Sequence, residues 1–164
     1  MRPLLLLVAL SLLPARARAE GSTIFAEKVG ACALLTAADA ARVWNVPMQV
    51  QVDAPGGASP GRSCTYHPVR PGVGRGSVHL LLLDAHEWSR LTTDAGARGR
   101  EVRPIKGIGD EAYVVRQKRA GALVLIVRRQ RSQFSVRYAG AGLDLTDPMR
   151  QVARSVAMRL PAGP

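Results

Sequence analysis

Apolar residues near the C-terminus recur every three or four positions, which is the spacing of one face of a helix. They are Met149, Val152, Ala153, Val156, Ala157 and Leu160. The preceding Thr146-Asp147-Pro148 is typical of a helix start, because proline fits the first turn, where its missing N–H loses no partner. The pattern predicts a terminal helix that packs on a sheet by its apolar face.

Capping residues predict two further helices. Thr36, followed three residues later by Asp39, has the form of a capping box with Asp in place of the usual Glu. It predicts a helix over about residues 37–45, which Pro47 ends. Asp84 is expected to cap another helix over about residues 85–92.

Six segments have the composition and alternation of β-strands, namely residues 48–52, 63–68, 77–83, 111–116, 122–128 and 133–138. The run from Leu123 to Val127 is apolar throughout, which predicts an interior strand covered on both faces. The polar stretch over residues 94–103 is expected to be a connection. We therefore predict an α+β fold, with a mostly antiparallel sheet of about five to six strands and two or three packed helices.

Residues 1–19 have the layout of a secretory signal peptide. Arg2 supplies a positive charge, residues 4–13 form an apolar run, and Ala17 and Ala19 form the small-residue pair of a cleavage site. The run is shorter than the roughly 20 residues that cross a bilayer as a helix. A buried N-terminal helix is the alternative, although Pro14 would end it. We expect an exported protein, periplasmic or secreted, with a single α+β domain over residues 20–164 and no transmembrane segment in the mature chain.

The chain contains two cysteines, Cys32 and Cys64. Exported proteins meet oxidising conditions, so we expect these two residues to form a disulfide. The alternative is a catalytic thiol, which needs a free cysteine with a general base beside it.

The net charge of the chain is +11, from 23 Lys and Arg against 12 Asp and Glu. Three of the arginines lie in residues 1–19, so the mature chain retains 20 basic residues against 12 acidic ones, a charge of +8. Two predicted hairpin turns hold the candidate contacts for an anionic partner: Lys118 and Arg119 in the first, Arg128, Arg129 and Arg131 in the second.

Consecutive turns of a β-meander lie at opposite ends of the sheet, so these basic residues are expected to form two separate patches. Nucleic acid is not expected as a partner, because binding it also needs stacking aromatic residues among the basic ones. An anionic component of the cell envelope, or another envelope protein, is the better electrostatic partner. The alternative is a solvated, arginine-rich surface with no partner.

Catalytic and metal-binding motifs are not evident in the sequence. The histidines are His67, His79 and His86, and we expect each to be structural or solvated. A metal site built on His79, Asp84 and His86 is not expected. His79 and Asp84 point to opposite faces of an extended strand, and Asp84 and His86 alone lack an evident third ligand. The glycines over residues 72–76 and 107–109 lead into strands, whereas a phosphate-binding loop opens a helix. We predict no catalytic residue, no metal and no cofactor.

Three short motifs occur in a fixed order: Cys32-Ala33-Leu34-Leu35-Thr36, Cys64-Thr65-Tyr66, and Gly107-Ile108-Gly109-Asp110-Glu111-Ala112-Tyr113. In this layout the chain resembles small exported bacterial proteins of unknown function, including actinobacterial secreted lipoproteins, over residues 30–160. It lacks their lipidation cysteine, which argues for a soluble mature form. The resemblance implies an exported, disulfide-bearing α+β domain without established catalytic residues.

The features together favour an exported, soluble binding or accessory domain of the bacterial cell envelope. The alternative is a small secreted hydrolase that uses His67 or His79 with a nearby carboxylate.

Overall fold

The structure is a computed structural model that describes residues 29–51, 61–70, 76–93, 100–117, 120–140 and 144–161. The predicted signal peptide, together with Lys118 and Arg119, lies outside the described residues. Among the residues described, no helix has the length and apolar character needed to cross a membrane.

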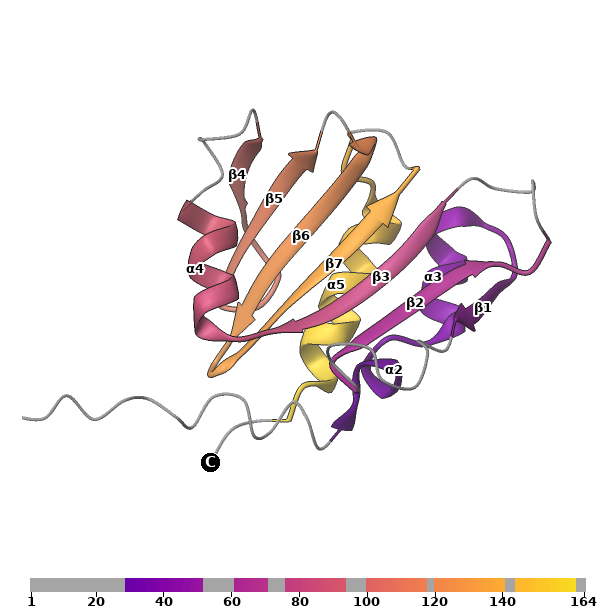
Figure 1. Cartoon of the computed structure of the whole chain (residues 1–164), viewed down its shortest axis with the longest axis horizontal. Helices are drawn as coiled ribbons and strands as arrows, with labels where there is room; N and C mark the ends of the chain where they lie inside the picture. Colours follow the sequence, from indigo (N-terminus) through magenta and orange to yellow (C-terminus); the bar gives the residue numbers. More distant parts are fainter. Residues whose placement is uncertain are drawn as a thin grey trace, which may run out of the picture.

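One antiparallel sheet of seven strands forms the centre of the molecule, in the order β1-β2-β3-β7-β6-β5-β4 (Figure 1). The strands are β1 (Met48–Gln51), β2 (Ser63–Pro68), β3 (Ser77–Leu83), β4 (Glu101–Ile105), β5 (Glu111–Gln117), β6 (Ala122–Arg129) and β7 (Ser132–Ala139). The helices described are α2 (Ala31–Leu34), α3 (Ala37–Trp44), α4 (Ala85–Thr93) and α5 (Asp147–Arg159). The α+β class is confirmed, but the prediction of five to six strands is wrong.

The strand that sequence reasoning missed is β4, because its sequence does not have the pattern of a strand. Glu-Val-Arg-Pro-Ile is half polar and contains Pro104, which has no N–H to donate to a neighbour. Proline is tolerated at the edge of a sheet. In the structure β4 pairs only with β5, at one edge, so the predicted connection ends in a strand. The four-residue helix α2 was also not predicted.

The helices α2, α3 and α5 pack on one face of the sheet, which we call the helix face. Figure 1 shows α3 and α5 behind the strands. The main core lies between these helices and the sheet, with Leu34, Leu80, Leu125, Phe134 and Val156 fully buried. All six residues of the predicted apolar stripe on α5 are buried, which confirms that this helix docks by its apolar face.

The helix α4 packs on the opposite face of the sheet. Its Trp88 lies in a second, smaller apolar cluster with Leu83, Val115, Val124 and Ile126. Alternate residues of β6 therefore point into different cores, and residues Ala122–Val127 are buried. This confirms the prediction of an interior strand covered on both faces. Asp84 and Glu87 cap α4 reciprocally, because each side chain accepts a hydrogen bond from the backbone N–H of the other.

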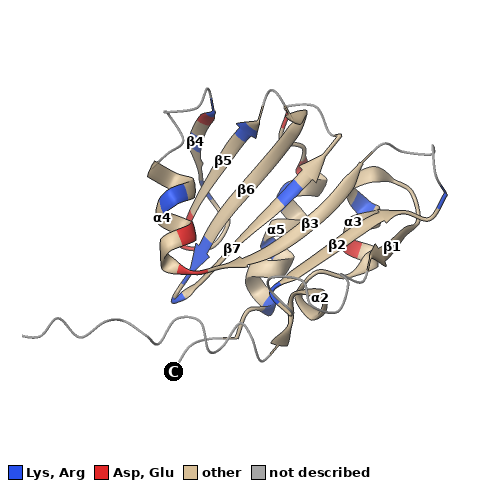
Figure 2. Cartoon of the chain, in the orientation of Figure 1, with Lys and Arg blue, Asp and Glu red and all other residues tan. Residues whose placement is uncertain are grey.

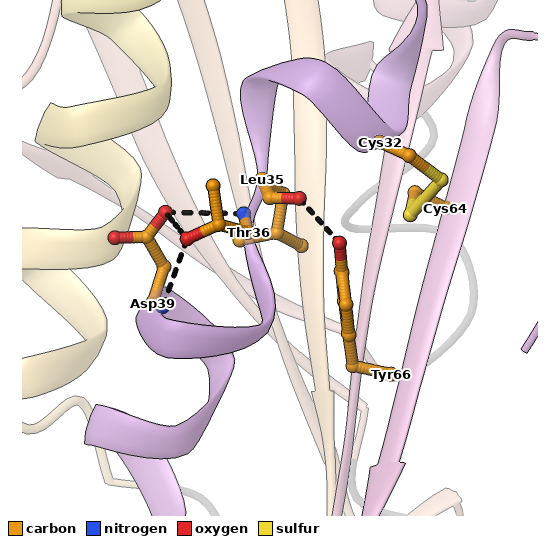
Figure 3. The surroundings of a disulfide bond; sticks show 6 residues. All are labelled: Cys32, Leu35, Thr36, Asp39, Cys64 and Tyr66. Carbon is orange, nitrogen blue, oxygen red and sulfur yellow. Dashed lines mark hydrogen bonds between the residues drawn. A yellow bond between two sulfur atoms is a disulfide. The ribbon is translucent and has the colours of Figure 1, made fainter. Parts of the chain in front are cut away.

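A buried carboxylate joins the two ends of the described chain. Asp39 is 1% exposed and completes the predicted capping box of α3 with Thr36 (Figure 3). It also forms an ion pair with Arg159, at the C-terminal end of α5, and with Arg42, 3.1 Å away. Arg159 donates a second hydrogen bond, of 2.8 Å, to the carbonyl of Leu34. The sequence predicted the cap but not the partner 120 residues away.

The predicted disulfide between Cys32 and Cys64 is confirmed (Figure 3). It connects α2 to β2, and the hydroxyl of Tyr66, two residues further along β2, donates a 2.6 Å hydrogen bond to the carbonyl of Leu35. Burial and the charge of Asp39 raise the pKa of Tyr66, so the hydroxyl keeps the proton that it donates. The segment from Ala31 to Leu35 is therefore attached to the sheet at two points.

We expect Asp39→Asn to destabilise the protein by about 3 kcal/mol, because it leaves Arg159 without its ionic partner. This value lies at the lower end for a buried pair, since the Arg159 side chain is 38% exposed. Arg42→Ala is the control and should cost less than about 1 kcal/mol, because its side chain is 60% exposed. Denaturation by urea measures both. Equal effects of the two substitutions would contradict the role given to Asp39.

The same substitution should alter the response to acid. Burial alone raises the pKa of Asp39, but hydrogen bonds from Arg159 and Thr36 and the charge of Arg159 outweigh it, so this pKa lies below its ordinary value. The stabilisation is therefore complete above the unfolded pKa of about 4 and is lost as the pH falls through the folded pKa. The difference in stability between wild type and Asp39→Asn should shrink below about pH 4.

Replacing both cysteines by serine should reduce the free energy of unfolding by about 3–4 kcal/mol, from the entropy of the chain that the disulfide closes. The two cysteines are 32 residues apart. The wild type should lose the same amount on reduction, whereas the double variant should not respond to reductant. Identical thermal unfolding of oxidised and reduced wild type would refute the prediction.

Candidate functional site

The sheet has a second, polar surface next to the area that α4 covers. It consists of the side chains of β1, β2, β3 and β7 that alternate with the core residues Tyr66, Leu80 and Val136. We call it the polar face, made up of Gln49, Gln51, Thr65, His67, Ser77, His79 and Arg137. These side chains are half-buried or exposed. In the described part of the chain, α2, α3 and α5 pack on the helix face of the sheet, and α4 packs over the second apolar cluster.

The register of the strands places four residues of the polar face in one row. Gln51 pairs with Thr65, Thr65 with His79, and His79 with Arg137. Neighbouring strands are about 4.8 Å apart, so Thr65 and Arg137 lie about 10 Å from each other with His79 between them. His67 lies two residues from Thr65 on the same side of β2. The structure thus brings together two of the three histidines, which sequence reasoning treated separately.

The polar face includes a positively charged side chain, that of Arg137, and no negatively charged one. The strands β1, β2, β3 and β7 contain no Asp or Glu. A hydrolase built on His67 or His79 needs a carboxylate to orient the imidazole, and these four strands do not supply one. Both cysteines are in the disulfide, so the alternative of a catalytic thiol is wrong. No group of three potential metal ligands occurs in the described part of the chain.

Arg137 differs from the other arginines of the sheet. Four arginines of the described strands have partners within the protein: Arg103 and Arg116 pair with Glu101, Arg128 with Glu111, and Arg129 with the carbonyl of Ala157. Arg137 is exposed and, within the ranges that the structure describes, has no ion pair or hydrogen bond of its side chain. Its neighbours across the strands are His79 and Val124.

The predicted basic contacts that the structure describes, Arg128, Arg129 and Arg131, lie away from the polar face. Arg128 pairs with Glu111 and lies 5.7 Å from the centre of the Trp88 ring, under α4. A hydrogen bond from Tyr113 to Glu111 raises the pKa of Tyr113, and burial and the charge of Glu111 add to this. Arg131 is exposed in the turn between β6 and β7 and also interacts with another group. Figure 2 shows Lys and Arg spread over several strand ends and helices.

A cavity of about 400 Å³ lies near the β1 edge of the sheet. Its lining consists of Val46, Pro47, Pro68, Val69 and Arg70. These residues flank the start of β1 and the end of β2, where the N–H of Val69 donates a 3.0 Å hydrogen bond to the carbonyl of Pro47. The lining is mostly apolar and contains one cation, so by itself it does not form a catalytic site.

Sequence reasoning named two residues of the polar face, His67 and His79, but not the face itself. The alternation along β7 puts Arg137 on the side of the sheet opposite Phe134 and Val136. No local pattern of the sequence showed which strand lies beside β7, because the paired residues of β3 and β7 are 50 to 62 positions apart. The pairing of His79 with Arg137 across neighbouring strands was therefore not predictable.

Comparisons with protein-family models, with curated protein sequences and with solved structures find no match to this chain.

Arg129→Gln and Arg137→Gln make the same chemical change at two strand arginines and should have different effects on stability. The first removes a charged hydrogen bond to the last turn of α5 and should cost about 2 kcal/mol. The second removes no internal partner and should change stability by less than about 0.5 kcal/mol. Chemical denaturation checks both, and a large loss for Arg137→Gln would show that this arginine is structural.

Proposed function

We propose that the protein is an exported, non-enzymatic binding or accessory domain of the bacterial cell envelope, and that the polar face is its binding surface. The observation that carries this proposal is a four-strand surface with neutral and cationic polar groups and no acidic residue. The two apolar clusters contain most apolar residues of the described strands, whereas the polar groups of this surface do not contribute to either cluster.

Export is supported by the sequence of residues 1–19 and is consistent with the disulfide. Disulfides form and persist in the periplasm and outside the cell, whereas reducing systems keep cytosolic thiols free. The resemblance to small exported bacterial proteins supports the same location. The envelope contains anionic lipids and polymers, and a mature chain with a charge of +8 is attracted to them.

Binding is favoured over hydrolysis because two acidic residues on the α4 side of the sheet already have partners within the protein. Glu87 and Glu111 lie on the side of the sheet that α4 covers and are engaged. Glu87 pairs with Arg62 at 2.6 Å and caps α4, and Glu111 pairs with Arg128 and Tyr113. Neither of these two carboxylates can orient a histidine general base without leaving its partners.

The polar face is also favoured over the predicted basic turns as the main binding surface. Arg128 and Arg129 have partners within the protein, so an external anion would have to compete with Glu111 and with the C-terminal end of α5. Arg131 is exposed in the turn between β6 and β7 and remains a candidate contact. Lys118 and Arg119 remain candidates from the sequence.

The test is retention of the exported protein on envelope material. The full chain is expressed in a bacterial host, and mass spectrometry of the exported form should give Glu20 as the first residue. This protein is then sedimented with isolated cell envelopes. Gln51→Trp should reduce the retained fraction at least tenfold, because it places a bulky side chain on the polar face.

Met158→Trp is the matched control, since Met158 is 69% exposed on α5, on the other side of the sheet. It should be retained like the wild type. Retention unaffected by Gln51→Trp, or a turnover of hydrolase substrates that His67→Ala or His79→Ala abolishes, would overturn the proposed function.

A further inference from the structure

We propose that the polar face binds an oxyanion, a phosphate or carboxylate group, between Arg137, His79 and Thr65, with His67 beside them. This inference rests on the proposed function and names the chemical class of the ligand. The observation behind it is the juxtaposition of hydrogen-bond donors, one of them a permanent cation, in a row that the register of three strands produces.

Arg137 is the centre of this site because it is a cation without an internal counterion. The other four arginines of the described strands bind a carboxylate or a helix carbonyl. Guanidinium groups bind carboxylates and phosphates through two parallel hydrogen bonds. Arg137 lies on an interior strand and is exposed, so its donors are accessible to a ligand.

The spacing of the row fits an oxyanion. Side chains directly opposite each other on antiparallel strands have Cβ atoms about 5 Å apart. An oxyanion between Arg137 and His79 therefore lies within reach of both, and Thr65 adds a hydroxyl donor from the next strand. His67 lies on the same strand and side as Thr65, and its side chain forms no hydrogen bond or ion pair with the residues described.

The absence of acidic residues makes the site selective for anions. Twelve Asp and Glu occur in the whole chain, yet the four strands of the polar face carry none. A carboxylate there would neutralise Arg137 and repel an incoming anion.

The experiment is a titration of the ¹⁵N-labelled exported protein, followed by NMR. Sodium phosphate is one probe and sodium glutarate the other, and sodium chloride at equal ionic strength is the reference. We expect at least one of the two anions to shift the amide signals of Thr65, His79 and Arg137 with saturation. The probe that saturates identifies the oxyanion as phosphate or carboxylate.

Arg137→Gln should weaken that binding by a factor of about 10–100, which is the range for a charged hydrogen bond. Arg103→Gln is the matched control: Arg103 is an exposed arginine on β4, paired with Glu101, and its loss should leave the affinity unchanged. Should Arg137→Gln alter the fold, its amide spectrum shows this, and His67→Gln then provides the second test, with an expected loss of severalfold.

Two results would overturn the inference: no saturable shift with either anion, or equal affinity of Arg137→Gln and wild type. These results are distinguishable from failure of the proposed function. If Gln51→Trp still blocks retention on envelopes while neither anion binds, the polar face binds a ligand of another class. If Gln51→Trp does not block retention, the proposed function itself fails.

Discussion

The buried carboxylate of Asp39 is the constraint that orders the helical layer. A charge that is 1% exposed must be compensated by nearby donors, and these come from two elements far apart in sequence, the start of α3 and the end of α5. Arg159 also binds the carbonyl of Leu34, so one guanidinium connects α2, α3 and α5. The disulfide and the hydroxyl of Tyr66 attach the same region to β2. The three helices are thus held together on one face of the sheet.

The packing of three helices on one face of the sheet affects how the opposite face is covered. The only helix of the described chain that packs on the second face is α4, and it covers the apolar cluster around Trp88, next to β5 and β6. The strands β1, β2, β3 and β7 carry polar side chains beyond that cluster. The division of the second face into an apolar part under α4 and the polar face is therefore a consequence of how the helices are distributed.

Many of the arginines that the structure describes make internal contacts. Arg128 lies between Glu111 and the Trp88 ring, Arg129 binds the end of α5, and Arg159 neutralises Asp39. A count of charges cannot distinguish such residues from those available to a partner. The structure makes the distinction and leaves Arg137, which was not among the predicted basic contacts, as the strand arginine without a partner among the residues described.

Most helices and strands could be predicted from local features of the sequence. Hydrogen-bonding caps and the 3.6-residue period identified α3, α4 and α5, alternation identified six strands, and the two cysteines of a chain with a secretory leader pattern indicated the disulfide. These features depend on residues close together or on the chemistry of a compartment. The tertiary structure alone decided that a proline-containing segment joins the sheet as β4, that Asp39 meets Arg159, and that His79 lies opposite Arg137. The last two result from pairing between distant segments, and their free energy comes from burial and register, which no local window of the sequence contains. The strand β4 pairs with its neighbour β5, but its composition does not have the pattern of a strand.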